Sequence, residues 1–217
     1  MPPSLDPASP EGWTVLVPVK RLDGAKSRLS TRTAGVRRDL SLAFAVDTVA
    51  AALAADGVAA VHVVTGDPRV SEAVRALGAE VVDDSAAGGL NDGLRLAARA
   101  VRDGGAGLLA ALAGDLPALH PDQLARALSL AADQHRSFVP DAAGTGTTLL
   151  CAAAGADLDP RFGERSCAAH AASGAVRLEP SDAAGLRRDV DTEVDLWDAA
   201  RLGTGPATRA LVPSYNG

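Results

Sequence analysis

Short apolar runs alternate with helical patterns along the first half of the chain, in units of about 25 residues. β-branched runs at 13–17, 58–64 and 80–82 predict buried strands, and helical spacing of apolar residues predicts helices at 36–55 and 69–77. A strand, a helix and a further strand in so short a unit form a right-handed crossover between parallel strands. The alternation therefore predicts an α/β fold: three α/β/α layers around a mixed, mostly parallel sheet.

The second half continues the pattern around an almost wholly apolar run at residues 107–113. Such a strand is typical of the centre of a parallel sheet, where both faces are buried. It ends in Gly114-Asp115-Leu116-Pro117, and open α/β sheets bind ligands at the carboxyl ends of their strands. The remaining predicted helices are at 91–102 (capped by Asn91), at 121–134, around His170 and at 194–202. The remaining predicted strands are at 137–139, 147–152, 176–178 and 186–190.

The 217 residues predict one domain, without an internal repeat or an interdomain linker. We expect this domain to cover residues 12–203, between a flexible tail at 1–11 and an irregular tail at 204–217. Aromatic residues make up only 3% of the chain, so the core must consist of Ala, Val and Leu.

Charge and cysteine content exclude several classes of protein. A net charge of −6 argues against nucleic acid as a partner, because phosphate-backbone binders need a basic surface. Cys151 and Cys167 are too few for a disulfide framework, and no Cys/His cluster has the spacing of a zinc site. Neither a signal peptide nor an apolar run of ~20 residues is present, so we expect a cytoplasmic protein without a membrane partner. The sequence leaves open whether the protein forms a homodimer.

A basic stretch follows the first predicted strand, with Lys20, Arg21, Lys26 and Arg28 within nine positions. Cations and free backbone N–H groups between a strand and a helix can hold a polyphosphate. The alternative is a solvated basic turn. The stretch is neither a Walker P-loop nor a dinucleotide-binding G-x-G-x-x-G loop, because the glycines of both are missing.

Acidic residues stand at the ends of two predicted strands. Asp115 follows the apolar central strand, where a lone carboxylate needs a metal ion or hydrogen-bond donors nearby. Asp189 and Asp191 point to one face of their strand and could share a metal ion with Asp115. Alternatively, Asp115 caps a turn and Asp191 caps the last helix.

Six motifs in order span about residues 13–200 of the chain. They are Pro18-Val19-Lys20-x-Leu22-x-x-Ala25-Lys26-Ser27-Arg28-Leu29, Gly89-Leu90-Asn91, Gly114-Asp115-Leu116-Pro117, Gly146-Thr147-Thr148, Phe162-Gly163-x-x-Ser166 with His170, and Asp189-Val190-Asp191-Thr192. With these motifs the chain resembles the nucleotidyltransferases of the glycosyltransferase-A-like fold. It is most similar to the phospholactate/phosphoenolpyruvate guanylyltransferase family of coenzyme F420 biosynthesis.

The resemblance implies a reaction in which the phosphate of a small three-carbon acid attacks the α-phosphorus of GTP and releases pyrophosphate. It implies that the catalytic residues are Lys26, Asp115 and Asp191. It also implies a Mg²⁺ cofactor held by Asp115, Asp191 and Asp189. It implies GTP binding by Lys20, Lys26, Arg28, Gly89 and Asn91. It implies binding of the acid by Thr148, Gly163 and Ser166.

Phosphoenolpyruvate is the favoured acid, because the Ala/Arg-rich sequence is similar to bacterial members to which the family assigns it. 2-Phospho-L-lactate and 3-phosphoglycerate remain open as alternative acids. A single methylene-versus-methyl difference between such acids is worth little binding energy in a small pocket. A molybdopterin or sugar-phosphate nucleotidyltransferase would show a G-x-G-x-R loop where this chain has Val19-Lys20-Arg21-Leu22. A nucleotide-sensing module without metal binding is the non-enzyme alternative.

Overall fold

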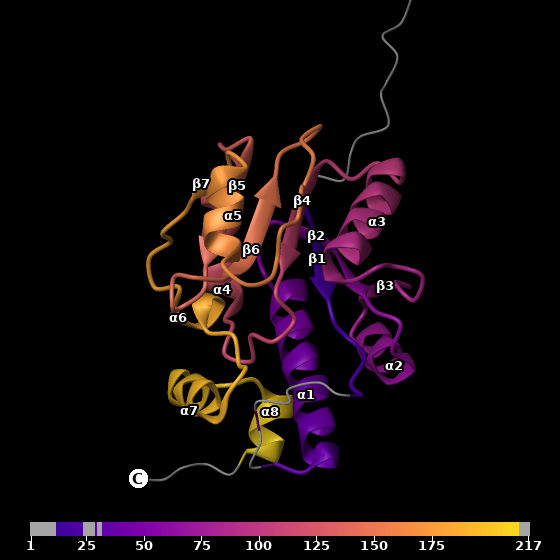
Figure 1. Cartoon of the computed structure of the whole chain (residues 1–217), viewed down its shortest axis with the longest axis vertical. Coiled ribbons are helices and arrows are strands. Elements are labelled where there is room, and N and C mark those ends of the chain that lie inside the picture. The colour runs from indigo at the N-terminus through magenta and orange to yellow at the C-terminus, as the bar shows by residue number, and fades with distance from the viewer. Residues whose placement is uncertain (1–11, 24–28, 30–31, 213–217) are drawn as a thin grey trace, which may run out of the picture.

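A computed structural model describes residues 12–23, 29 and 32–212, and Figure 1 shows a sheet with helices packed around it. The strands are β1 (Trp13–Pro18), β2 (Val58–Val64), β3 (Glu80–Val82), β4 (Leu108–Leu112), β5 (Arg136–Pro140), β6 (Thr147–Ala152) and β7 (Val176–Arg177). The helices are α1 (Ala34–Leu53), α2 (Pro68–Ala76), α3 (Leu90–Asp103), α4 (Pro121–Ala131), α5 (Ser166–Ala172), α6 (Ala184–Arg187), α7 (Glu193–Leu202) and α8 (Pro206–Leu211). None of the helices in these ranges is long and apolar enough to cross a membrane.

The sheet separates two apolar cores, as the alternation of side chains along a strand requires. Val15 and Val17 of β1 pack with residues of α1, α2 and α4 on one face. Leu16, between them, packs with α3 on the opposite face. The structure thus confirms the predicted α/β/α layers, with a core built chiefly from Ala, Val and Leu.

The seven strands lie in the order β3-β2-β1-β4-β6-β5-β7. β1 is parallel to both β2 and β4, and β3 extends this parallel half. β6 is inserted antiparallel between β4 and β5, with Leu112 paired to Leu149. The start of β6 therefore lies beside the end of β4, at the edge of the sheet where the sequence predicts the site.

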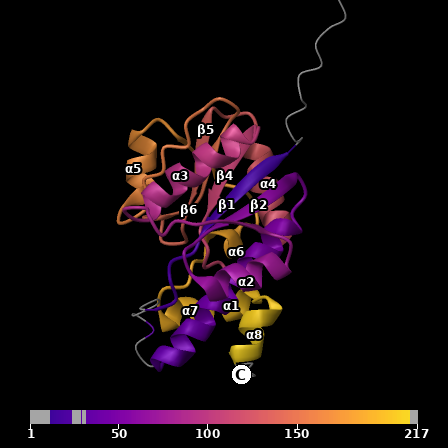
Figure 2. The ribbon, with the colours of Figure 1, turned by 90° about the vertical axis from the view of Figure 1, so that its right-hand side faces the viewer.

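A third apolar cluster extends the domain beyond this edge of the sheet. It joins Leu40 and Phe44 of α1 to Val190, to Leu196 of α7 and to Val212. Figure 1 and Figure 2 both show α7 and α8 beside α1, below the sheet.

Two predictions for the C-terminal part of the chain are wrong. Residues 206–211, predicted as part of an irregular tail, form α8, because the buried carboxylate of Asp47 accepts the N–H groups of Ala207 and Thr208 at 3.0 and 2.8 Å. The segment 186–190 was predicted as a strand, but its first two residues belong to helix α6. Its Leu186 is buried against the core, and the Leu186 N–H donates to Gln123 Oε1 at 3.1 Å instead of to a strand.

Candidate active site at the carboxyl edge of the sheet

The basic turn starts at the carboxyl end of β1, where Lys20 is exposed. Buried Asp67, the N-cap of α2, holds the turn because the Leu22 N–H donates to its carboxylate at 2.9 Å. Burial works to raise the pKa of Asp67, but the N–H groups of Leu22 and of the first turn of α2 hold this pKa below its ordinary value. Lys26 and Arg28 lie outside the described residues, so their contacts with GTP stay predictions.

Asp115 stands in a tightly fixed loop after β4. A Cβ on Gly114 would lie 2.7 Å from the Pro18 carbonyl oxygen, so glycine allows the ends of β1 and β4 to approach each other. On the other side of Asp115, the Leu116 N–H donates to the buried hydroxyl of Thr48 in α1 at 3.0 Å. The backbone on both sides of this carboxylate is therefore held by neighbouring elements.

The structure brings together the acidic residues that the sequence places 74 positions apart, from 115 to 189. The Val190 N–H donates to the Asp115 carbonyl oxygen at 3.1 Å, so the two segments lie side by side. Burial, followed by the negative charges of Asp115, Asp141 and Asp191, raises the pKa of Asp189 to about 7. These four carboxylates therefore form one electrostatically coupled group.

Asp141 is a member of this group that sequence reasoning missed. It directly follows β5, as Asp115 follows β4, and an acidic residue at a strand end was the available signal. Its carboxylate also accepts the N–H groups of Thr145 and Gly146, each at 2.9 Å. Asp141 thus fixes the turn that leads into β6.

The helix after this group does not use Asp191 as its cap. Thr192 is the N-cap of α7, and it forms a capping box with Asp195. The alternative that Asp191 only caps the last helix is therefore wrong.

The oxygen donors of this group suit a hard divalent cation. Mg²⁺ is usually held by one or two protein carboxylates together with water and substrate phosphates. Within residues 12–23, 29 and 32–212, no three acidic, His or Cys side chains are arranged closely enough to hold a metal by themselves. Asp115, Asp189 and Asp191 would therefore need substrate oxygens to complete a metal site, and a cation there would offset the negative charges that, after burial, raise the pKa of Asp189. Metal binding by these residues stays a prediction.

Of the residues expected to hold the acid, Thr148 lies in a segment that is joined to the loop of Asp115. The Ala113 N–H donates to the Thr148 carbonyl oxygen at 2.8 Å, which joins the start of β6 to the loop of Asp115. The Thr148 hydroxyl is buried without a hydrogen-bond partner among the described residues. Ser166 is buried at the start of α5, and its N–H donates to the Gly163 carbonyl oxygen at 3.2 Å. Their contacts with an acid stay predictions.

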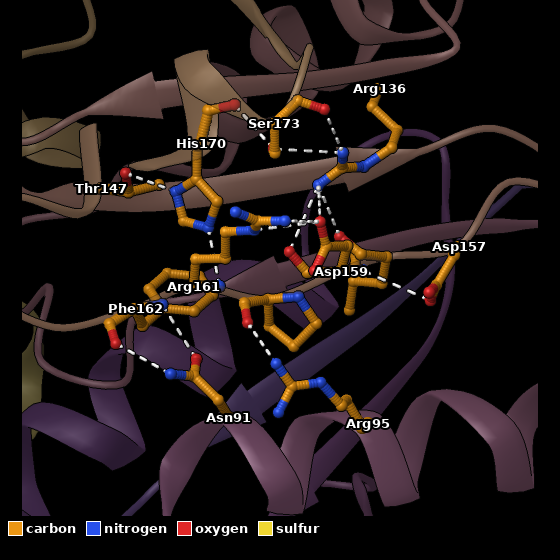
Figure 3. Close-up of polar contacts among 12 residues, drawn as sticks. Asn91, Arg95, Arg136, Thr147, Asp157, Asp159, Arg161, Phe162, His170 and Ser173 are labelled. Carbon is orange, nitrogen blue, oxygen red and sulfur yellow. Dashed lines mark hydrogen bonds and ion pairs between the residues drawn. The ribbon is translucent and has the colours of Figure 1, made fainter. Parts of the chain in front are cut away.

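Gly89 and Asn91 lie at the start of α3. Gly89 is the N-cap, with φ of 144°, so the prediction that Asn91 caps this helix is wrong. The Asn91 side chain instead reaches Phe162: its amide donates to the Phe162 carbonyl at 2.9 Å, and its oxygen accepts the Phe162 N–H at 2.8 Å. Figure 3 shows both bonds. GTP binding by Gly89 and Asn91 stays a prediction.

His170 of α5 holds the same loop from the opposite side (Figure 3). The fully buried ring accepts the Arg161 N–H at Nε2, 3.0 Å away, and its Nδ1 lies 2.9 Å from the Thr147 hydroxyl. Burial and then the positive charge of Arg136 lower the pKa of His170 to about 4, so the ring is neutral at pH 7.

Arg136 is a second residue that sequence reasoning missed. Its guanidinium donates to the carbonyl oxygens of Leu158, Asp159 and Ser173 at 3.1 to 3.2 Å (Figure 3). The sequence around Arg136 does not indicate this role, because the carbonyl oxygens that it binds come from two distant loops.

The chain matches the MobA-like NTP transferase domain over residues 41–179. A nucleotidyl transferase from Methanothermobacter has the same fold, with a TM-score of 0.62 and 24% identity over 88% of this chain and 97% of that one. The chain therefore belongs to the class of the nucleotidyltransferases.

Relatives of known name define the family within this class. The phosphoenolpyruvate guanylyltransferase of Streptomyces avermitilis is 52% identical over 94% of this chain and 98% of its own length. The protein of the same name from Streptomyces coelicolor is 53% identical over 92% and 95%. The chain belongs to the phosphoenolpyruvate guanylyltransferase family, as its motifs predict. The domain match begins after the basic turn, which is where the chain lacks a G-x-G-x-R loop.

Proposed function

We propose that this chain joins the GMP moiety of GTP to phosphoenolpyruvate, giving enolpyruvoyl-2-diphospho-5′-guanosine and pyrophosphate. The family resemblance implies that this reaction is a step in coenzyme F420 biosynthesis. The observation that supports the proposal is the hydrogen bond from the Ala113 N–H to the Thr148 carbonyl oxygen, which joins the start of β6 to the loop of Asp115. Thr148 also has a buried hydroxyl that is unpartnered among the described residues. An acceptor phosphate near Thr148 would lie close to the residues that suit a metal-bound nucleotide.

The reaction forms a bond from an acceptor phosphate oxygen to the α-phosphorus of GTP and breaks the bond to the β-phosphate. The attacking oxygen is already anionic, so positioning and charge neutralisation can carry most of the catalysis without a strong general base. This agrees with His170, whose two ring nitrogens are both engaged away from solvent. Lys20 and Lys26 are proposed to neutralise the GTP phosphates.

Asp115, Asp189 and Asp191 are proposed to hold Mg²⁺. When bound, the ion would neutralise phosphate charge and orient the GTP phosphates. Thr148 and Ser166 are proposed to hold the acceptor through hydroxyl and backbone N–H groups.

Product analysis tests the proposal. The protein is incubated with GTP and MgCl₂ and with phosphoenolpyruvate, 2-phospho-L-lactate or 3-phosphoglycerate in separate reactions, and the products are identified by mass spectrometry. We expect an adduct with phosphoenolpyruvate and release of pyrophosphate, both lost in Asp115→Asn. Preferred turnover of another acid would correct the substrate, and GTP binding without any adduct would favour the nucleotide-sensing module.

A further inference from the structure

We propose that His170 is a positioning residue for the acceptor acid: its neutral ring fixes the loop at Arg161 and Phe162 relative to the start of β6. The inference rests on the proposed function, because it concerns the acceptor side of the same site. His170 itself is too deeply buried to touch substrate, with 0% of the residue exposed. It acts through Arg161 and Thr147 (Figure 3).

The two hydrogen bonds define one tautomer of the ring. Nε2 accepts the backbone N–H of Arg161 and so cannot carry a proton itself. Nδ1 therefore carries the proton and donates it to the Thr147 hydroxyl. The opposite tautomer would lose the Arg161 bond, and a doubly protonated ring would lose it as well.

Both partners of the ring lie beside proposed acceptor ligands. Thr147 precedes Thr148 in β6, and Arg161 stands two positions before Gly163. Ser166 lies one turn before His170 on α5, on the same side of the helix. A single ring is thus linked to all three segments that are expected to hold the acid.

The loop depends on such support because its backbone is not in a regular conformation. Gly163 has φ of 136° and Arg165 has φ of 57°, in the region that side chains rarely adopt. The Phe162 ring packs edge-on against His170, with ring centroids 5.2 Å apart. Asn91 binds both backbone groups of Phe162 from α3, so two helices hold consecutive residues of the loop.

Two substitutions separate the polar role of the ring from its volume. His170→Phe keeps an aromatic ring among Phe138 and Phe162 but removes both hydrogen bonds. His170→Gln places an amide oxygen near the position of Nε2, where it can again accept the Arg161 N–H. The matched controls are His135→Phe and His135→Gln, because His135 is exposed and no described partner binds its side chain.

We expect His170→Phe to raise KM for phosphoenolpyruvate about tenfold, the effect of about one lost hydrogen bond, while KM for GTP changes less than about twofold. His170→Gln should recover much of the loss, and both controls should match the wild type. Equal increases in both KM values, or a Gln variant no better than Phe, would overturn the proposal. Thermal melting of each variant shows whether the fold persists.

A measurement on the wild type keeps the proposal testable if the variants do not fold. ¹⁵N NMR of the histidine rings at pH 7 should show His170 neutral, with its proton on Nδ1. A proton on Nε2 contradicts the proposed geometry. Failure of the proposed function is a separate result: the wild type would form no GMP adduct with any of the three acids. In that case calorimetric titration of phosphoenolpyruvate replaces KM, and unchanged affinity in His170→Phe overturns the positioning role.

Discussion

Replacing Asp189 by asparagine should stabilise the metal-free protein at high pH. The pKa of this carboxyl is raised from 3.8 to about 7 by burial and by Asp115, Asp141 and Asp191. The folded protein therefore holds this proton more tightly than the unfolded chain. Its contribution to stability is fully present below about pH 4 and is lost as the pH rises through about 7.

The size of the effect follows from the difference between the two pKa values. Each pKa unit corresponds to about 1.4 kcal/mol, which gives an upper bound of about 4 kcal/mol for Asp189. The side chain is half-buried, and solvent screens part of the repulsion, so we expect about 2 kcal/mol. The asparagine side chain of the variant cannot ionise, and at pH 4 it resembles the protonated carboxyl that it replaces.

Urea unfolding at pH 4 and pH 8, with a chelator present, measures the difference. Asp189→Asn and the wild type should be about equally stable at pH 4, and the variant should be more stable by about 2 kcal/mol at pH 8. Asp133→Asn is the matched control, because exposed Asp133 precedes β5 and so lies at the other end of that strand from Asp141.

Adding MgCl₂ at pH 8 should then stabilise the wild type more than the variant, because a bound cation offsets the repulsion among the carboxylates. A difference between wild type and Asp189→Asn that stays the same from pH 4 to pH 8 would refute the coupling. An equal response of the two proteins to MgCl₂ would remove Asp189 from the metal ligands.

The other predictions concern single contacts or motif residues. Asp115→Asn should lower kcat at least about 100-fold while the fold stays intact by circular dichroism, and near-normal turnover would contradict a metal role. Lys26→Ala should raise KM for GTP. An unchanged dependence of the rate on GTP concentration would favour the alternative that the basic turn is only solvated. Thr48→Val leaves the Leu116 N–H unpaired and should cost about 1–3 kcal/mol of stability, whereas Thr48→Ser should not, as urea unfolding can show. Asp47→Ala should cost about 1–2 kcal/mol, also by urea unfolding, and no loss would mean that α8 contributes little to the domain.

The parallel half of the fold could be predicted from sequence because local signals coincide there. Apolar runs, helix-stop glycines and short crossovers agree from β1 to β4, so the strand ends and Asp115 fall where the sequence predicts them. The approach of the 115 and 189 segments was expected from acidic residues at the ends of two predicted strands, and the segments do lie side by side, although the second predicted strand is wrong. The reaction and the acceptor-binding residues were predicted from the motifs, because the periodicity of apolar residues does not indicate them.

The errors share a physical cause: tertiary contacts decide local structure where the local preference is weak. Residues 206–211 contain a proline and show no apolar period, but Asp47, some 160 positions earlier, supplies the missing cap. Asn91 is a good cap by type, yet its amide is used by Phe162, 71 positions away. Arg136 was missed for the same reason, because its partners are carbonyl oxygens that only the folded chain brings near. Asp141, by contrast, had a sequence signal in its place at a strand end.

The reversed direction of β6 explains how one edge of the sheet can handle two anionic substrates. In a wholly parallel sheet, residues at the start of a strand lie far from the carboxyl edge, so the start of β6 could not meet Asp115. Because β6 runs antiparallel to β4, its first residues, Thr147 and Thr148, lie beside the end of β4. The basic turn belongs to the parallel half, and the loop held by His170 packs against the antiparallel half. The two substrates would then bind to separately supported halves, with the carboxylates between them, so that changes in KM for one substrate need not alter KM for the other.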